Sequence, residues 1–215
     1  MKPADKWNDN LNNDYKTLSN KLFVYDKWLD RYVNYIKNSK MPIVDLGCGI
    51  GNDTLYLKKL GKDVISVDFS DEALKVVKSN IPNAQTLRMD FEKEWLLKKE
   101  SADLIIANLS LHYFDEKTTF RILNSIKKTL VDNGILIVRV NSIDDDNYGA
   151  DSMSELEHHF YNALDLKKRF FDKDDIMYFF RDFDIISCKK ELFSTLIHKK
   201  GKSVWECVLK NSTRR

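Results

Sequence analysis

Three glycines at alternate positions follow a short apolar segment, and this is the feature that most constrains the fold of the chain. The segment reads Ile43-Val-Asp-Leu-Gly-Cys-Gly-Ile-Gly-Asn-Asp-Thr54, which places glycine at Gly47, Gly49 and Gly51. Glycine adopts backbone conformations that a Cβ forbids, and it lets a ligand approach the main chain closely. An apolar strand that runs into such a loop and then into a helix predicts a nucleotide-binding crevice in an open α/β sheet.

The residues around the glycines narrow the choice of ligand. A dinucleotide site has the pattern G-x-G-x-x-G, with a pyrophosphate at the helix N-terminus. Here the third glycine comes one residue early, and Asn52 stands in its expected place. Asp45, two residues before the first glycine, would repel a pyrophosphate and would suit a cationic group. The pattern therefore favours a cationic nucleotide, with a nicotinamide dinucleotide as the alternative.

Acidic residues also end the next apolar segments. Val64–Asp68 reads as a second strand, and Asp68 follows the glycine loop by about twenty residues, where an acid can accept hydrogen bonds from ribose hydroxyls. A short third strand is closed by Asp90 and Phe91. Ala102–Asn108 reads as a fourth strand.

These four segments, in this order, resemble the class I S-adenosylmethionine-dependent methyltransferases over about residues 40–140. The resemblance implies that the cofactor is S-adenosyl-L-methionine, with its methionine end lined by Asp45, Gly47 and Gly49. Its ribose would lie at Asp68 and its adenine beside Asp90 and Phe91, and Asn108 and the residues just after it would face the methionine and the substrate. Asp90 as a turn former and Phe91 as a core residue are the alternatives. The full set of implied cofactor-binding residues is Asp45, Gly47, Cys48, Gly49, Asp68, Phe69, Asp90, Phe91 and Asn108. Cys48 is interpreted as a packing residue of this loop and not as a nucleophile, because no base is specified near it.

His112 is the candidate general base, because it follows the fourth strand, where donor and acceptor would meet. An imidazole can take a proton from a hydroxyl, thiol or amine during methylation. A loop histidine that only shapes the pocket is the alternative. Tyr113 and Tyr148 are candidate residues on the substrate side. His158 and His159 are adjacent, with no third ligand at metal spacing nearby, so no metal site is predicted.

Strands and helices alternate along the chain, and the strands are almost continuously apolar. This pattern predicts an α/β fold, a Rossmann-like doubly wound and mostly parallel sheet in three α/β/α layers. Antiparallel strands over 184–197 and 203–210 would form a C-terminal edge hairpin with a solvated basic turn at Lys199–Lys202. The other expected strands cover 41–46, 63–68, 84–89, 103–107 and 135–141, with a turn at 132–134. The expected helices cover 21–38, 52–60, 70–80, 116–130 and 173–181. Ser70 and Asp172 are expected N-caps, and Ile176, Met177 and Phe180 are expected to face the core.

Length predicts a single domain over 1–215. Within it we expect an N-terminal arm and helix over 1–40 and a cofactor-binding core over 41–141. A substrate-side insertion over 142–170 and a C-terminal helix and hairpin over 171–215 would complete it.

Composition excludes several classes of protein. Lys and Arg number 35 and Asp and Glu 33, so the net charge of +2 gives no reason to expect nucleic acid or an acidic membrane as partner. No stretch of about 18 apolar residues predicts a membrane span, and the first residues lack the apolar core of a signal peptide. Three cysteines without a C-x-x-C pattern predict reduced thiols and a cytoplasmic location.

The leading functional hypothesis is therefore a methyltransferase that acts on a small-molecule acceptor. Methylation of RNA, DNA or protein is the second hypothesis. The fourth strand lacks the two prolines that usually follow in methyltransferases of base amines, and no basic domain is appended. A non-catalytic cofactor-binding protein is the third. The acceptor atom and the oligomeric state stay open.

Overall fold

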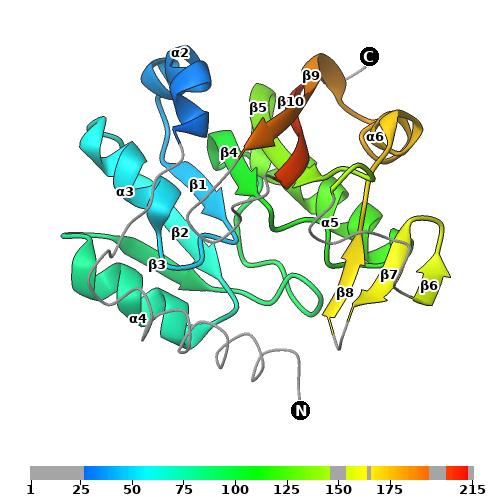
Figure 1. Ribbon diagram of the computed structural model, residues 1–215. Coiled ribbons are helices and arrows are strands. Elements are labelled where there is room, and N and C mark those ends of the chain that lie inside the picture. Colours follow the sequence, from blue (N-terminus) through cyan, green and yellow to red (C-terminus); the bar gives the residue numbers. More distant parts are fainter. Residues whose placement is uncertain (1–26, 146–153, 164–165, 194–201, 213–215) are drawn as a thin grey trace.

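The computed structural model describes residues 27–145, 154–163, 166–193 and 202–212. A seven-stranded sheet with the strand order β3-β2-β1-β4-β5-β10-β9 forms its centre (Figure 1). The first five strands in this order pair in parallel, and β10 pairs antiparallel with both β5 and β9. The predicted fold class, including the antiparallel C-terminal edge, is confirmed. The strands are β1 Ile43–Leu46, β2 Val64–Asp68, β3 Gln85–Arg88, β4 Ala102–Asn108, β5 Leu130–Asn141, β9 Asp184–Phe193 and β10 Lys202–Lys210.

The direction of winding reverses between β1 and β4, which are neighbours in the sheet. The carboxyl ends of strands at such a reversal are where open α/β sheets bind their ligands. The glycine loop follows β1, and Asn108 ends β4. The fold therefore brings both segments to the same place.

Helices cover both faces of the sheet and bury two apolar clusters. On one face, α5 (Glu116–Thr129) and α6 (Lys173–Phe179) pack on strand residues such as Ile105 and Val138. On the other face, the 3-10 turn η1 (Trp28–Tyr32), α2 (Val33–Asn38) and α3 (Asn52–Lys59) pack on residues such as Ile106 and Ile137. The helix α4 (Asp71–Asn80) contacts β2 and β3. The predicted three-layer arrangement is therefore present.

Helix caps agree with the sequence where they were expected. The Ser70 hydroxyl accepts from the amide of Ala73 at 3.1 Å, and α4 begins directly after it. Asp172 and Asp175 form a reciprocal capping box at the start of α6. Such caps satisfy amide groups that have no partner within the helix.

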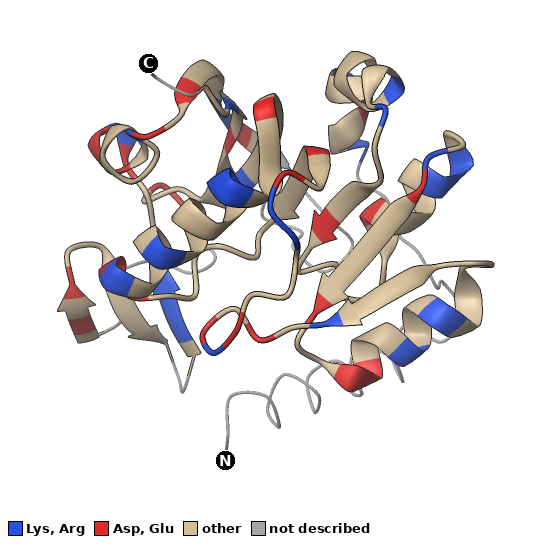
Figure 2. Cartoon of the chain, turned by 180° about the vertical axis from the view of Figure 1, so that it is seen from behind, with Lys and Arg blue, Asp and Glu red and all other residues tan. Residues whose placement is uncertain are grey.

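Figure 2 shows that acidic and basic residues both occur along the helices and loops seen from this side. No helix in the described part of the chain is long and apolar enough to cross a membrane.

A second, three-stranded antiparallel sheet was not predicted from the sequence. Its strands are β6 Ser154–Glu157, β7 Phe160–Ala163 and β8 Leu166–Arg169, in the order β6-β7-β8. The Glu157 carboxylate accepts from the amide of Glu116 at 2.9 Å, which ties this sheet to the start of α5. Each strand has only four residues, and β6 and β8 are mostly polar, so the segment carries no sustained apolar alternation of the kind that indicates strands.

Several local predictions were wrong. The expected helix over 21–38 is described only from residue 27, where it is split into η1 and α2. The expected turn at 132–134 is an irregularity inside β5, because pairing with β4 shifts register there. Met177 lies on the outer side of α6 and is 54% exposed. Lys202, expected in a solvated turn, begins β10 and is only 6% exposed.

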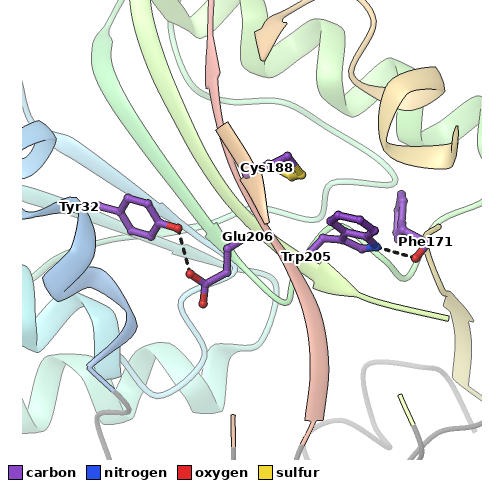
Figure 3. Close-up of a disulfide and its surroundings, with 6 residues drawn as sticks. Tyr32, Phe171, Cys188, Trp205 and Glu206 are labelled. Carbon is purple, nitrogen blue, oxygen red and sulfur yellow. Dashed lines mark hydrogen bonds between the residues drawn. A yellow bond between two sulfur atoms is a disulfide. The ribbon is translucent and has the colours of Figure 1, made fainter. Parts of the chain in front are cut away.

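The cysteine prediction was also wrong for two of the three residues. Cys188 and Cys207 form a disulfide between β9 and β10 (Figure 3). The pairing register places these two residues directly opposite each other, with their Cα atoms 4.0 Å apart. Strand register is a long-range property, so the spacing of cysteines along the sequence does not reveal it. Cys48 is a free thiol.

Candidate active site

The glycine loop is a tight turn held against β2. All three glycines have positive φ, of 77°, 52° and 92° in chain order. A Cβ on Gly47 would lie 2.3 Å from the Cβ of Ser110, so that position is closed to any side chain. A Cβ on Gly49 would meet no atom within 4 Å. The loop is therefore packed on one side at Gly47 and open at Gly49.

Asp45 lies beneath this loop and is only 1% exposed. Its carboxylate accepts from the hydroxyl of Thr54 at 2.6 Å, and that hydroxyl also lies 2.9 Å from the hydroxyl of Ser66. Burial, together with the negative charge of Asp53, raises the pKa of Asp45 to about 8. An approaching cation would favour ionisation of this carboxyl group.

Asp68 joins the end of β2 to the glycine loop. One carboxylate oxygen accepts from the amide of Gly49 and the other from the amide of Ser70, both at 2.9 Å. Burial raises the pKa of Asp68 in spite of these hydrogen bonds. Each oxygen keeps a second lone pair for a further donor. Within the described residues, neither Asp45 nor Asp68 is ion-paired with a basic side chain.

Asp53 is a third buried carboxylate of the crevice, and the sequence analysis did not single it out. One of its oxygens accepts from the indole Nε1 of Trp28 and the other from the side-chain amide of Asn108, both at 2.9 Å. Oδ1 of Asn108 is buried without a hydrogen-bond partner in the described part of the chain. Asp53 follows the last glycine by two residues and opens α3, which is the signal that could have drawn attention to it. Nothing local marks Trp28.

The expected adenine residues lie on the far side of β2 and have local partners. Asp90 accepts from the amide of Glu92 at 3.0 Å and pairs with Lys93 at 2.5 Å. Phe91 is 7% exposed and packs in the core against Trp95 and Phe114. These contacts are those of the alternatives, a turn former and a core residue. Phe69 is half-buried directly after Asp68.

The remaining cofactor-loop residue, Cys48, is half-buried. Burial and the charges of Asp45 and Asp68 raise the pKa of its thiol well above the usual range. A thiol held in its protonated form is a poor nucleophile.

His112 follows β4 and is only 1% exposed. Burial and the positive charges of Lys202 and Lys168 hold the pKa of its imidazole well below the usual range. Its ring lies against the ring of Tyr113, with 4.2 Å between the centroids. Tyr148 lies outside the described residues.

His158 and His159 meet two carboxylates that the sequence spacing did not reveal. One ligand atom from each of His158, His159, Asp172 and Asp175 lies within 4.8 Å of the others. Nδ1 of His159 is 2.6 Å from Asp175. The two carboxylates are distant from the histidines in the sequence, and they come close because α6 packs against the turn between β6 and β7.

Comparison with known sequences points to one family. A family model described as a methyltransferase domain matches residues 43–134. A protein of Alkaliphilus oremlandii, described as an uncharacterized methyltransferase, is 22% identical over 209 residues, covering 94% of this chain and 92% of its own length. The malonyl-acyl carrier protein O-methyltransferase of Bacillus cereus is 25% identical over 67% of this chain, and a protein of Invertebrate iridescent virus 6 is 30% identical over 55% of it. This chain spans about half the length of those last two relatives, 54% and 42%.

Comparison with solved structures gives the same fold. An S-adenosylmethionine-dependent methyltransferase of Methanosarcina mazei superposes with a TM-score of 0.71 at 16% identity, over 89% of this chain and 99% of that one. The 1,6-didemethyltoxoflavin-N1-methyltransferase of Burkholderia thailandensis, solved with 1,6-didemethyltoxoflavin and S-adenosylhomocysteine, gives 0.64 at 15% identity, over 99% and 92%. The matching domain over residues 43–134, the relative that spans almost the whole chain and the superposed structures therefore give this chain a methyltransferase domain with the fold of the S-adenosylmethionine-dependent methyltransferases.

Proposed function

We propose that this chain binds S-adenosylmethionine in the crevice at the glycine loop and transfers its methyl group to a small-molecule acceptor. The observation that carries the proposal is the pair of buried carboxylates, Asp45 and Asp68, without a basic partner in the described part of the chain. Buried carboxyl groups are costly to ionise unless a positive charge or hydrogen-bond donors face them. S-adenosylmethionine offers an α-ammonium group, a sulfonium and ribose hydroxyls.

Further features of the crevice fit this cofactor. Gly49 leaves open space where a side chain would stand, so a ligand can approach the main chain. Oδ1 of Asn108 is a buried acceptor that lacks a donor among the described residues. Asp68 would take the ribose hydroxyls on its remaining lone pairs, and Asp45 would act through its charge from beneath the loop. Asp90 and Phe91 stay proposed for the adenine end.

When bound, S-adenosylmethionine would supply an electron-poor methyl carbon for a lone pair of the acceptor, with S-adenosylhomocysteine as the leaving group. The residues of this chain align the acceptor and exclude water. Proximity and alignment alone can account for most of the acceleration in such a reaction. His112 stays neutral because of its lowered pKa, so it can accept a hydrogen bond from the acceptor, whereas the same shift makes it a weak base.

A small acceptor is favoured over a macromolecule by the burial of the acceptor side. His112 is 1% exposed, and the net charge of +2, from 35 basic and 33 acidic residues, gives no electrostatic reason to expect nucleic acid. The related toxoflavin enzyme of Burkholderia thailandensis was solved with a small acceptor. Methylation of RNA or protein is the alternative.

Calorimetry with S-adenosylhomocysteine tests cofactor binding. We expect a Kd on the order of micromolar, weakened in Asp68→Ala by about 1–3 kcal/mol, the scale of lost hydrogen bonds to a charged group. Asp103→Ala is the matched control, because Asp103 also lies on a strand of this sheet and accepts amide hydrogen bonds, but from Lys40 and Met41 at the opposite end. Preferential binding of NAD, or equal losses in the two variants, would contradict the proposal.

A second experiment identifies the acceptor class. Methyl-labelled S-adenosylmethionine is incubated with the chain and a cell extract, and the label is separated by size. Label in a small metabolite supports the proposal, whereas label in RNA or protein supports the alternative.

A further inference from the structure

A buried polar cluster lies at the carboxyl edge of the sheet, next to the proposed methyl-transfer site. It consists of His112 after β4, Asn141 at the end of β5, Asp145 beyond it, Lys168 on β8 and Lys202 at the start of β10. None of the five is more than 8% exposed.

Backbone hydrogen bonds hold these five residues together. The amide of Arg169, next to Lys168, donates to the carbonyl of His112 at 2.7 Å. The amide of Ser142 donates to the carbonyl of Ser203 at 3.1 Å, which joins the end of β5 to the start of β10. The carbonyl of Asn141 accepts from the amide of Phe171 at 2.8 Å. Four segments that are distant in the sequence therefore meet at one place.

Strand register places Asn141 and Lys202 on the same face of the sheet. Asn141 is paired with Val204, and Arg139 with Glu206, and the side chains of paired residues point to the same side. Lys202 precedes Val204 by two residues and so shares that side. Arg139 is also the β5 partner of Asn108, the last residue of β4. Asn141 is two residues beyond Arg139 on β5, so the cluster begins next to Asn108, the residue proposed to face the cofactor.

His112 and Asn141 bring unsatisfied polar atoms into the cluster. Nδ1 of His112, and both Nδ2 and Oδ1 of Asn141, are buried without a hydrogen-bond partner in the described part of the chain. Buried polar atoms are almost always hydrogen-bonded, because burial removes the water molecules that would otherwise bind them. The three atoms of His112 and Asn141 indicate a place where a polar ligand would supply the missing hydrogen bonds.

The two lysines indicate that the ligand carries a negative charge. Burial lowers the pKa of Lys168 and that of Lys202 to about 8, although the charge of Asp145 acts in the opposite direction on both. Their positive charges also hold down the pKa of His112. An anion between the two ammonium groups would favour their charged forms.

We propose that the methyl acceptor carries a carboxylate or phosphate group that binds between Lys168 and Lys202, with His112 and Asn141 completing its hydrogen bonds. This inference rests on the proposed function and specifies its substrate class. The anionic group positions the acceptor by binding to the lysines, and the methyl group is transferred to another atom of the same molecule. Because the lysines are 8% and 6% exposed, a polymer backbone does not reach them, so the acceptor is small.

Thermal unfolding with S-adenosylhomocysteine at saturation tests the anion site. The probes are sodium phosphate and sodium acetate, each compared with sodium chloride at equal ionic strength. For an anion present at about five times its Kd, we expect the wild-type midpoint to rise by about 2–4 °C. Lys168→Met and Lys202→Met should abolish the rise. Lys75→Met is the control, because Lys75 is an exposed lysine of α4, and it should keep the full response.

The two anions distinguish the sources of the charge. A rise with phosphate alone assigns a phosphate-bearing acceptor, a rise with acetate alone a carboxylate, and a rise with both an anionic oxygen group in general. No rise with either, or a rise that persists in both methionine variants, overturns the inference.

Two further measurements cover the cases in which the cofactor does not bind or a variant does not fold. Calorimetry with S-adenosylhomocysteine on the same proteins distinguishes failure of the anion site from failure of the proposed function. Normal cofactor binding without an anion response overturns the anion site alone. Absent cofactor binding overturns the proposed function. Nitrogen NMR of the wild-type histidines covers the case in which a variant fails to fold. Phosphate or acetate should shift the His112 signal and not those of His158 and His159, and an unshifted His112 signal contradicts the proposal.

Discussion

The indole Nε1 of Trp28 donates to Oδ1 of Asp53 at 2.9 Å, and the other oxygen of Asp53 accepts from Asn108 at the same distance. One carboxylate thus connects η1, the start of α3 and the end of β4. The Trp28 ring also stacks on Arg139, with its guanidinium carbon 4.7 Å from the ring centroid. The first described segment of the chain is thereby fastened to the proposed cofactor crevice.

Replacing Trp28 by Phe tests whether this link supports cofactor binding. Trp28→Phe keeps an aromatic ring beside Arg139 but removes the donor to Asp53. We expect binding of S-adenosylhomocysteine to weaken by about 1 kcal/mol, the net worth of one hydrogen bond. Trp95→Phe is the matched control, since it removes an indole donor to Thr129 on the other face of the sheet. Calorimetry should show an unchanged Kd for the control, and equal effects in both variants would contradict the role of Trp28.

Alanine substitutions at two glycines with positive φ distinguish the effect of ligand contact from that of backbone strain. Gly49 and Gly61 both have positive φ, and a Cβ at either would meet no atom within 4 Å. Alanine at either position should therefore cost a similar conformational strain, about 1–2 kcal/mol in the free energy of unfolding. Only Gly49→Ala should also abolish or strongly weaken binding of S-adenosylhomocysteine, because its methyl group would point into the proposed crevice. Denaturant unfolding and calorimetry measure the two effects, and intact binding by Gly49→Ala would argue against a ligand at that place.

The raised pKa of Asp45 predicts a dependence of stability on pH. Its pKa is about 8 in the folded chain, against an ordinary value near 4 after unfolding. Between these values the folded chain holds a proton that the unfolded chain has released, so the contribution of Asp45 to stability falls as pH rises from 4 to 8. Asp45→Asn removes this dependence while leaving an oxygen to accept from Thr54.

We therefore expect the unliganded Asn variant to gain stability relative to wild type as the pH rises from 5 to 7.5, by at least about 1 kcal/mol, since one pKa unit corresponds to about 1.4 kcal/mol. Denaturant titrations at several pH values measure this difference. A difference that stays constant with pH would mean that Asp45 is ionised throughout.

Glu206 is the centre of a buried ionic network between β5 and β10. Its carboxylate accepts from Arg139 at 2.6 Å and from the hydroxyl of Tyr32 at 2.9 Å, the second of which is drawn in Figure 3. Arg139 and Glu206 are 2% and 0% exposed in their side chains. Glu206→Gln keeps the shape and removes the charge that faces Arg139, so we expect a loss of about 3 kcal/mol in the free energy of unfolding.

Glu72→Gln is the control for this change. It removes the carboxylate of the exposed Glu72–Lys75 pair, and exposed pairs contribute little to stability. Chemical denaturation should show no measurable change for it. A similarly small change for Glu206→Gln would mean that the buried pair gives no net stabilisation.

Local pattern was enough to predict the sheet, the glycine loop and the strand-end acids. Apolar periodicity, glycine conformation and cap chemistry act over a few residues, so Gly47, Ser70 and Asp68 can be recognised in the linear sequence. The small sheet β6-β7-β8 was not predicted because its strands have only four residues each, too few to establish a periodicity.

Tertiary packing alone decided which distant residues share a buried place. Strand register brought Cys188 opposite Cys207 and put Lys202 in the interior, and the turn before β7 brought His159 to Asp175. The approach of η1 to α3 joined Trp28 to Asp53. The sequence by itself determined the class of fold and the place of the glycine loop, because those depend on local conformational preference. The buried cluster of His112, Lys168 and Lys202 arose only in three dimensions, because burial is a property of everything that packs around a side chain and not of the side chain itself.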